Sequence, residues 1–165
     1  MMTSEVIEIV PGDLADPRII DLLNYHVTAA HEQSPPESCH AFDVSGLQQP
    51  EISFWAAWAG DQLLGVGALM DLGDGHGEVK SMHTAKAARG RGVGSAMVRH
   101  IIATARNRGF DRLSLETGSM DYFAPARALY ARHGFVECGP FEGYKLDPNS
   151  VFLTLDLAAD RTAST

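Results

Sequence analysis

The sequence predicts an α+β fold, in which a mixed, mostly antiparallel sheet of six or seven strands is flanked by helices. Three observations support this prediction. Segments with alternating apolar and polar residues outnumber segments with helical periodicity. The helical segments interrupt runs of strands instead of alternating regularly with them. A tight-turn signal, Gly60-Asp61, joins two neighbouring strand-like segments, as a hairpin requires.

The N-terminal half is expected to contain a strand, a helix and a hairpin. The strand covers residues 6–10, and either Asp13 or Asp16 caps a helix from Pro17 to about His31. Residues 33–38 must form a loop, because adjacent prolines remove backbone donors and force the preceding residue into an extended conformation. The hairpin strands follow at 52–59 and 62–70.

The C-terminal half is expected to alternate strands and helices before ending in two strands. A strand begins at His76 or Gly77 and ends at Thr84. Gly109 ends the next helix, because glycine accepts the left-handed conformation that commonly follows a helix. The remaining segments are a helix at 95–108, a strand at 112–117, a helix at 124–133 and strands at 135–138 and 151–157. We therefore expect one domain over 1–165 with an ordered core at about 5–158.

Composition excludes several classes of function. The formal net charge of -8 argues against a nucleic-acid partner, because Lys and Arg supply most contacts to phosphate backbones. Residues 1–10 lack the basic segment of a signal peptide, and no apolar run approaches the length of a membrane span. A cytoplasmic protein without membrane contact is expected, with Cys39 and Cys138 as free thiols. His31 and His40 stand in no metal-binding pattern, so no metal is expected.

The segment from Arg89 to Gly94 separates a strand-like run from a helix-like run. The first turn of a helix has backbone N–H groups without partners and carries the positive end of the helix dipole. Gly90, Gly92 and Gly94 allow close approach of an anion and positive φ angles, and Arg89 and Arg91 add positive charge. The segment therefore predicts a binding site for phosphate.

The spacing of these glycines separates the segment from other phosphate-binding loops. A P-loop ends in Gly-Lys-Ser/Thr and a dinucleotide fingerprint reads G-x-G-x-x-G, and neither is present here. The pattern R-x-x-G-x-G, at Arg89, Gly92 and Gly94, resembles the pyrophosphate loop of the GNAT superfamily of acetyltransferases, which bind acetyl-CoA. The expected order of elements also resembles the GNAT fold over nearly the whole chain.

This resemblance implies an N-acetyltransferase that uses acetyl-CoA and no metal. Its acceptor would be the amine of a small molecule, which attacks the thioester directly in a ternary complex. The alternative is a non-catalytic module that binds or senses acyl-CoA. The oligomeric state stays open, with a homodimer as one alternative.

The resemblance also implies where the coenzyme binds. Backbone groups of Met82 and Thr84 match positions that pair with the pantetheine arm, and an N–H near Met82 or His83 would stabilise the thioester oxygen. Phe123 stands where many members carry asparagine. The expected cofactor-binding residues are Met82, His83, Thr84, Arg89, Gly90, Arg91, Gly92, Val93, Gly94, Ser95, Phe123, Ala126 and Tyr130.

The candidate acid and base are a tyrosine and two glutamates. Within A-x-x-L-Y, Tyr130 matches the family's tyrosine that protonates the coenzyme thiolate, a transfer uphill by about 2 kcal/mol for unperturbed groups. Glu78 lies six residues before Thr84, where the resemblance implies a glutamate base like that of the family's histone-acetylating branch, so Glu78 is the favoured base and Glu116 is its rival. Lys80 shares a strand face with Glu78, so a purely structural ion pair with either carboxylate is the alternative.

The acceptor pocket is expected at residues 33–43 and 139–150, together with the neighbouring strands. Lys80 is also a candidate for holding a carboxylate of the acceptor. These segments mix both signs of charge and therefore select no class of acceptor. The candidate substrate-binding residues are Glu37, His40, Lys80, Glu116 and Tyr144.

Overall fold

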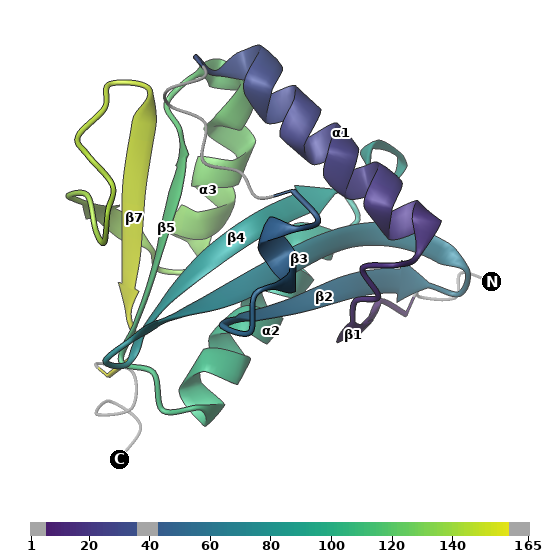
Figure 1. Cartoon of the computed structure of the whole chain (residues 1–165), viewed down its shortest axis with the longest axis horizontal. Helices are drawn as coiled ribbons and strands as arrows, with labels where there is room; N and C mark the ends of the chain where they lie inside the picture. Colours follow the sequence, from purple (N-terminus) through teal and green to yellow (C-terminus); the bar gives the residue numbers. More distant parts are fainter. Residues whose placement is uncertain (1–5, 36–42, 159–165) are drawn as a thin grey trace.

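Seven strands form one mixed sheet in the order β1-β2-β3-β4-β5-β7-β6, which confirms the predicted α+β architecture (Figure 1). The computed structural model describes residues 6–35 and 43–158. The strands are β1 (Glu8–Pro11), β2 (Ile52–Ala59), β3 (Gln62–Gly73), β4 (His76–Thr84), β5 (Arg112–Gly118), β6 (Val136–Cys138) and β7 (Ser150–Asp156). The helices are α1 (Pro17–Gln33), α2 (Val93–Asn107) and α3 (Ala124–Arg132), with 3₁₀ turns η2 (Gly46–Gln48), η3 (Lys86–Ala88) and η4 (Asp121–Phe123).

Differences from the predicted boundaries occur at strand and helix ends, and the largest is at β3, which continues three residues past the predicted Met70 to Gly73. Helix α2 begins two residues before the predicted Ser95, because Gly92 is its N-cap and adopts a left-handed φ of 81°. Helix α1 continues past His31 to Gln33, and the Ser34 amide then donates to the Ala30 carbonyl at 3.0 Å. These differences move boundaries and leave the type of each element as predicted.

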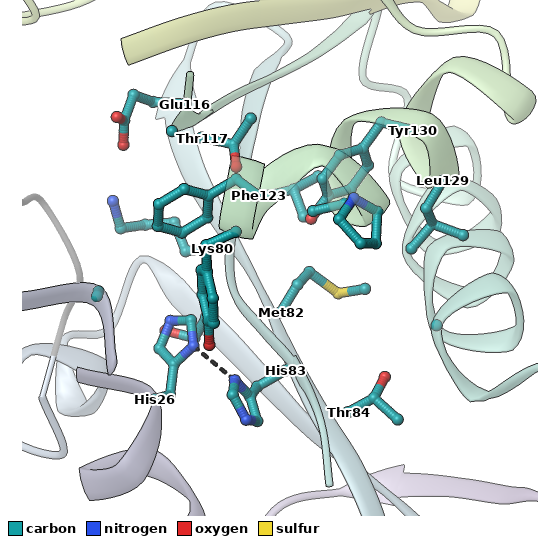
Figure 2. Close-up of a pocket in the computed structure, with 18 of the residues that line it drawn as sticks. His26, Lys80, Met82, His83, Thr84, Glu116, Thr117, Phe123, Leu129 and Tyr130 are labelled. Carbon is teal, nitrogen blue, oxygen red and sulfur yellow. Dashed lines mark hydrogen bonds between the residues drawn. The ribbon is translucent and has the colours of Figure 1, made fainter. Parts of the chain in front are cut away.

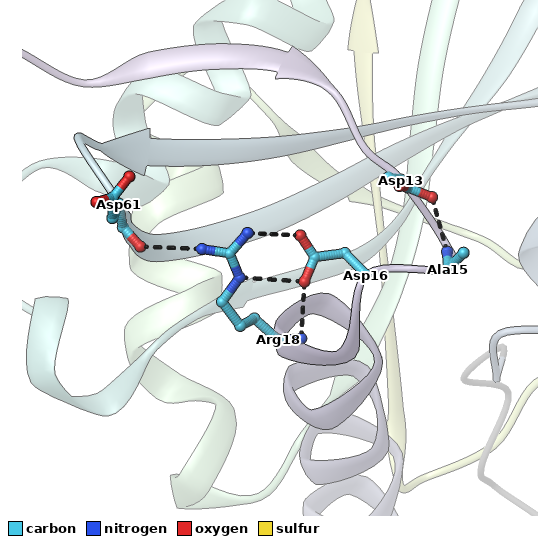
Figure 3. A network of polar contacts seen from close by, with 5 residues as sticks. All are labelled: Asp13, Ala15, Asp16, Arg18 and Asp61. Atoms are coloured by element: carbon cyan, nitrogen blue, oxygen red, sulfur yellow. Dashed lines mark hydrogen bonds and ion pairs between the residues drawn. The ribbon is translucent and has the colours of Figure 1, made fainter.

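Polar contacts at the start of α1 fix this helix against the β2–β3 hairpin (Figure 3). Asp16, and not Asp13, caps the helix, since its carboxylate accepts a hydrogen bond from the Arg18 amide at 2.9 Å. The Arg18 guanidinium pairs with the same carboxylate at 2.8 Å and donates to the Asp61 carbonyl at 3.4 Å. It also lies 4.5 Å from the centre of the Trp58 ring. The helix is thereby held across the sheet, where it contacts β3 and β4.

Helices α1 and α2 cover opposite faces of the sheet (Figure 1). Side chains of successive strand residues point to opposite faces, so β2 contributes to two separate hydrophobic clusters. Phe54 and Ala56 pack with Ile19 and Leu23 of α1 in the first cluster. The second cluster contains Trp55 and Ala57 of β2, together with the buried face of α2, namely Val93, Met97, Val98, Ile101, Ile102 and Ala105.

Strands β4 and β5 are joined over only part of their length. Their parallel pairing is confined to residues 76–78 of β4 and 112–114 of β5. Beyond these pairs β4 continues to Thr84 and β5 to Gly118 without a shared ladder, and the two strands diverge (Figure 1). The halves of β4 and β5 that do not pair with each other therefore line the two sides of a space within the sheet.

A β-bulge interrupts β4 at Ser81, which has a positive φ of 56°. On β3, Val66 pairs with His83 while Ala68 pairs with Lys80, so β4 holds one more residue than β3 between these pairs. An extra residue reverses the alternation of side chains beyond it. His83 consequently lies on the same face of the sheet as Lys80.

The two faces of β4 thus differ in polarity. Val79 and Met82 pack into the cluster around α2. Glu78, Lys80 and His83 lie on the other face, where His83 contacts α1 through His26. The bulge therefore adds His83 to Glu78 and Lys80 on the side of the sheet covered by α1.

Candidate functional site

A cavity of about 550 Å³ lies between the diverging halves of β4 and β5 (Figure 2). Its walls come from both strands, from the start of α2, from α3 and from the second half of α1. The cavity therefore connects the predicted phosphate site with the polar face of β4.

Most predicted site residues line this cavity. Arg91 is the exception among the predicted cofactor-binding residues, since it is absent from the lining. Glu37 and His40 lie outside the described residues. The predicted residues that line the cavity are Glu78, Lys80, Met82, His83, Thr84, Arg89, Gly90, Gly92, Val93, Gly94, Ser95, Glu116, Phe123, Ala126, Tyr130 and Tyr144.

The loop before α2 has the backbone conformation that the sequence predicts. Gly90 and Gly92 have φ angles of 79° and 81°, which other residues rarely adopt. The first bond of the helix runs from the Ala96 amide to the Gly92 carbonyl at 3.0 Å. The amides of residues 93–95 precede it and have no acceptor within the helix. Because residues 93–95 line the cavity, its wall here has the positive potential that favours a diphosphate.

Glu78, Lys80 and Tyr144 form a buried polar cluster in the cavity wall. The Lys80 ammonium lies 3.1 Å from the Glu78 carboxylate, and these side chains are only 7% and 5% exposed. The Tyr144 hydroxyl donates to Glu78 Oε2 at 2.6 Å and accepts a bond from Lys80 at 3.3 Å. Burial and the Glu78 charge raise the pKa of Tyr144, which therefore keeps its proton. The ion pair expected as the structural alternative for Lys80 is thus present.

Glu116 lies across the cavity on β5. Burial raises the pKa of its carboxyl to about 7, although the charge of Lys80 acts in the opposite direction. The side chain is thereby divided between its charged and neutral forms at neutral pH. A carboxylate in this state is suited to accepting a proton from an amine.

Tyr130 lies near the end of α3 with its side chain almost fully buried, at 6% exposure. Its ring meets the Phe135 ring edge to face, with 5.6 Å between the ring centres. Burial raises the pKa of the hydroxyl above its usual value, so Tyr130 holds its proton at neutral pH. The residue lines the cavity on the side of α2, where the predicted phosphate site begins.

Comparison with known proteins assigns the chain to a family. The model of the acetyltransferase (GNAT) family matches residues 19–135. The chain belongs to the GNAT acetyltransferase family. It is accordingly an N-acetyltransferase enzyme, as the resemblance of its glycine-rich loop implied.

Individual proteins extend the GNAT match over almost the whole chain. Uncharacterized N-acetyltransferase YedL of Escherichia coli strain K12 is 50% identical over 145 residues, which are 88% of this chain and 91% of YedL. A protein of Klebsiella pneumoniae assigned to the acyl-CoA N-acyltransferases has a TM-score of 0.76 at 27% identity, covering 93% of this chain and 99% of that one. A Bacillus subtilis acetyltransferase, solved in complex with CoA, has a TM-score of 0.66 at 22% identity, with coverages of 92% and 99%.

His26 is a titratable residue of this GNAT site that is absent from the sequence-based candidates. His26, on α1, lines the cavity together with Ala30 and Ser34. His26 and Ala30 are four residues apart and so form a stripe along one face of α1, and Ser34 is the C-cap that follows. This spacing is the sequence signal for His26, and it does not predict that this face of α1 packs against β4.

Among the residues that the structure describes, no cluster of His, Cys, Asp and Glu side chains could hold a metal ion. No helix in the described ranges is long and apolar enough to cross a membrane. Cys138 is a free thiol, whereas Cys39 lies outside the described ranges.

Removing the Lys80 charge is expected to destabilise the fold. The substitution Lys80→Met would leave the buried Glu78 carboxylate without its ion-pair partner, a change that costs roughly 3 kcal/mol in comparable cases. Urea unfolding at pH 7 measures this loss of free energy. The double variant Lys80→Met with Glu78→Gln should recover most of it, because no buried charge remains. Equal stability of Lys80→Met and the wild type would show that the pair is not buried.

Proposed function

We propose that this GNAT enzyme transfers the acetyl group of acetyl-CoA to the amine of a small molecule, by direct attack within a ternary complex. The observation that carries the proposal is the continuity of one cavity. It runs from the amides at the start of α2 to Glu116 and the Glu78–Lys80–Tyr144 cluster. Both substrates would then occupy the same space, so that no covalent enzyme intermediate is needed.

Several features of the lining residues fit coenzyme A. The start of α2 and Arg89 supply the amides and positive charge that would hold the diphosphate. At residues 82–84, β4 is paired with β3 through His83 and Thr84 but has no partner on β5, so its edge facing β5 offers backbone groups along the cavity, where the pantetheine arm would lie. The CoA complex of the Bacillus subtilis acetyltransferase, which shares this fold, is consistent with such binding. Bound acetyl-CoA would supply the activated acetyl group.

Glu116 is the better candidate for the base, although Glu78 was favoured by its position in the sequence. Glu78 accepts a hydrogen bond from Tyr144 and pairs with Lys80, both through Oε2, so proton uptake at that oxygen would disrupt the buried cluster. Glu116 has its pKa raised to about 7 by burial, which reduces the gap to an amine of pKa about 8 to 10. In this proposal Glu116 takes the proton from the amine as its nitrogen bonds to the carbonyl carbon.

Tyr130 is the proposed acid. When the carbon–sulfur bond breaks, Tyr130 would give its hydroxyl proton to the departing thiolate and later regain a proton from solvent. Burial raises the pKa of Tyr130, which by itself makes this transfer harder. The thiolate would be desolvated in the same cavity, so the pKa of its thiol would be raised as well.

Loss of the Tyr130 hydroxyl is expected to slow turnover more than it weakens coenzyme binding. Tyr130→Phe keeps the ring that packs on Phe135, so the fold should be retained. We expect kcat to fall about 100-fold, which is the lower range for general acid catalysis, because water can also protonate a thiolate. Release of free thiol measures kcat, and titration calorimetry measures affinity for acetyl-CoA. An unchanged kcat would remove Tyr130 from the mechanism.

Two measurements on the wild-type protein test the proposed function itself. Titration calorimetry with acetyl-CoA reports binding, and thiol release over a panel of primary amines reports transfer. We expect saturable binding and release that depends on the amine. Binding without release for any amine would contradict amine acetylation, and absence of binding would contradict use of acetyl-CoA.

A further inference from the structure

Two histidines from different elements meet at the cavity on the side of α1. His26 Nδ1 lies 3.0 Å from His83 Nδ1, and the rings are close to perpendicular, at 76° with 5.0 Å between centres (Figure 2). The Tyr25 ring makes a second edge-to-face contact with the His83 ring, with 5.5 Å between the ring centres. Both histidines line the cavity. The proposed mechanism does not use either side chain.

The contact between the two Nδ1 atoms restricts where the protons lie. A hydrogen bond between two ring nitrogens requires one N–H and one lone pair, so the two rings must carry opposite tautomers. Burial lowers the pKa of both histidines to about 4, with the neighbouring Arg89 charge also acting on His83. Both rings are therefore neutral at pH 7, and only one of them is protonated at Nδ1.

The surroundings of His83 decide which ring carries that proton. His83 Nε2 is buried and has no hydrogen-bond partner among the described residues. An unpaired buried N–H is rarer in proteins than an under-satisfied acceptor. This favours the tautomer of His83 with its proton on Nδ1, which would then donate to His26 Nδ1. The proton of neutral His26 must then be on Nε2.

We propose that His26 Nε2–H binds an oxygen of the acceptor, so that the acceptor is an amine that also carries a carboxylate or carbonyl group. This inference rests on the proposed function, because it assigns the acceptor to the α1 side of the same cavity. His26 would touch the acceptor, whereas His83 is a positioning residue that fixes the tautomer of His26. Lys80 does not replace this donor, because its charge is matched by Glu78 at 3.1 Å.

The rest of the wall indicates the carbon skeleton of the acceptor. Tyr122, Phe123 and Tyr144 line the cavity beside the polar groups. Aromatic side chains favour an apolar or aromatic skeleton. Phenethylamine, L-phenylalanine and L-phenylalaninamide form a suitable set of probes, because they share one skeleton and differ only at the oxygen-bearing group.

Nitrogen NMR of the intact protein labelled with ¹⁵N-histidine tests the tautomers without any acceptor. At pH 7 we expect His26 protonated at Nε2 and His83 at Nδ1, with both rings still neutral at pH 5 because their pKa values are about 4. His83→Phe should leave His26 exchanging between tautomers. The opposite pair of tautomers, or a charged ring at pH 7, would overturn the proposal.

Thiol release with the three probes tests the contact itself. For the wild type we expect a lower KM for L-phenylalanine and its amide than for phenethylamine. His26→Phe should raise KM about 10- to 100-fold for the two oxygen-bearing probes, as expected for loss of one hydrogen bond to a polar partner, and leave phenethylamine unchanged. His31→Phe, an exposed change on the same helix, is the control.

The outcomes separate this inference from the proposed function. Acetyl-CoA affinity, measured by calorimetry, should be the same in the wild type, His26→Phe and His31→Phe. Equal changes of KM for all three probes in His26→Phe would overturn the acceptor contact while leaving the acetyltransferase mechanism intact. Loss of acetyl-CoA binding by the wild-type protein would instead overturn the proposed function.

Discussion

Gly92→Val is expected to abolish measurable binding of acetyl-CoA. Gly92 caps α2 at a φ of 81°, a conformation that a β-branched residue does not readily adopt. The loop would have to change its path, and the amides of residues 93–95 would no longer meet the diphosphate together. Loss of two charge-assisted hydrogen bonds, at roughly 1.5 kcal/mol each, weakens binding at least about 100-fold. Titration calorimetry with acetyl-CoA measures the effect.

The turn of the β2–β3 hairpin provides a matched control for this change. Gly60 also has a positive φ, of 58°, and a side chain there would meet no atom within 4 Å, as at Gly92. Gly60 does not line the cavity. Gly60→Val should therefore lower thermal stability to a similar extent and leave acetyl-CoA affinity unchanged. Wild-type affinity in Gly92→Val would place the diphosphate elsewhere.

Glu116→Gln is expected to lower kcat about 1000-fold while acetyl-CoA affinity stays within about twofold. Glutamine keeps the size of the side chain and removes its ability to take a proton. In the wild type, kcat should rise as the pH increases towards about 7 and level off above it, because the base must be deprotonated. The variant should lose this rise. Stopped assays of thiol release between pH 5.5 and pH 9 give the profile.

An exposed glutamate on β6 is the control for this substitution. Glu137→Gln, outside the cavity lining, should keep the wild-type rate and pH profile. If Glu116→Gln keeps the rise in kcat and Glu78→Gln loses it, Glu78 is the base, as its position in the sequence first indicated.

The raised pKa of Glu116 also has a consequence for stability. The pKa is about 7 in the folded protein and 4.5 in the unfolded chain, so between these values the folded state binds the proton more tightly. The contribution of this group to stability is complete below pH 4.5 and is lost as the pH rises through 7. Urea unfolding measures the free energy of unfolding at pH 5 and at pH 8. The decrease between these two pH values should therefore be smaller for Glu116→Gln than for the wild type. An equal decrease in both proteins would contradict a raised pKa of the Glu116 carboxyl in the folded state.

The sequence was most informative where function depends on local backbone conformation. The cradle at residues 89–95 was predicted because glycines that tolerate positive φ, followed by a helix start, are features of a short segment. Observed φ angles of 79° and 81° at Gly90 and Gly92 agree with that prediction. An ion pair of Lys80 with Glu78 or Glu116 was the structural alternative, and the structure contains the pair with Glu78, which shares a strand face with Lys80.

Other features depend on contacts between distant segments. The bulge at Ser81 has no glycine or proline to mark it, yet it places His83 on the face of Lys80. His26 and His83 are 57 positions apart, and no local pattern relates them. Tyr144 was a candidate only as a member of a loop, and the fold brings its hydroxyl to the Glu78 carboxylate.

Periodicity, glycine positions and a short motif were enough to predict the element order, the glycine-rich loop before α2 and the family, because these features belong to short segments of the chain. The surroundings of the two glutamates, and the contact of His26 with His83 at the cavity, are visible only in the folded chain. The pKa of Glu116 depends on the apolar and charged groups around it, and the tautomer of His26 depends on a ring from another element. The burial of Glu116 and the contact between the two histidine rings arise only when the chain has folded. The sequence of a single segment therefore does not predict them.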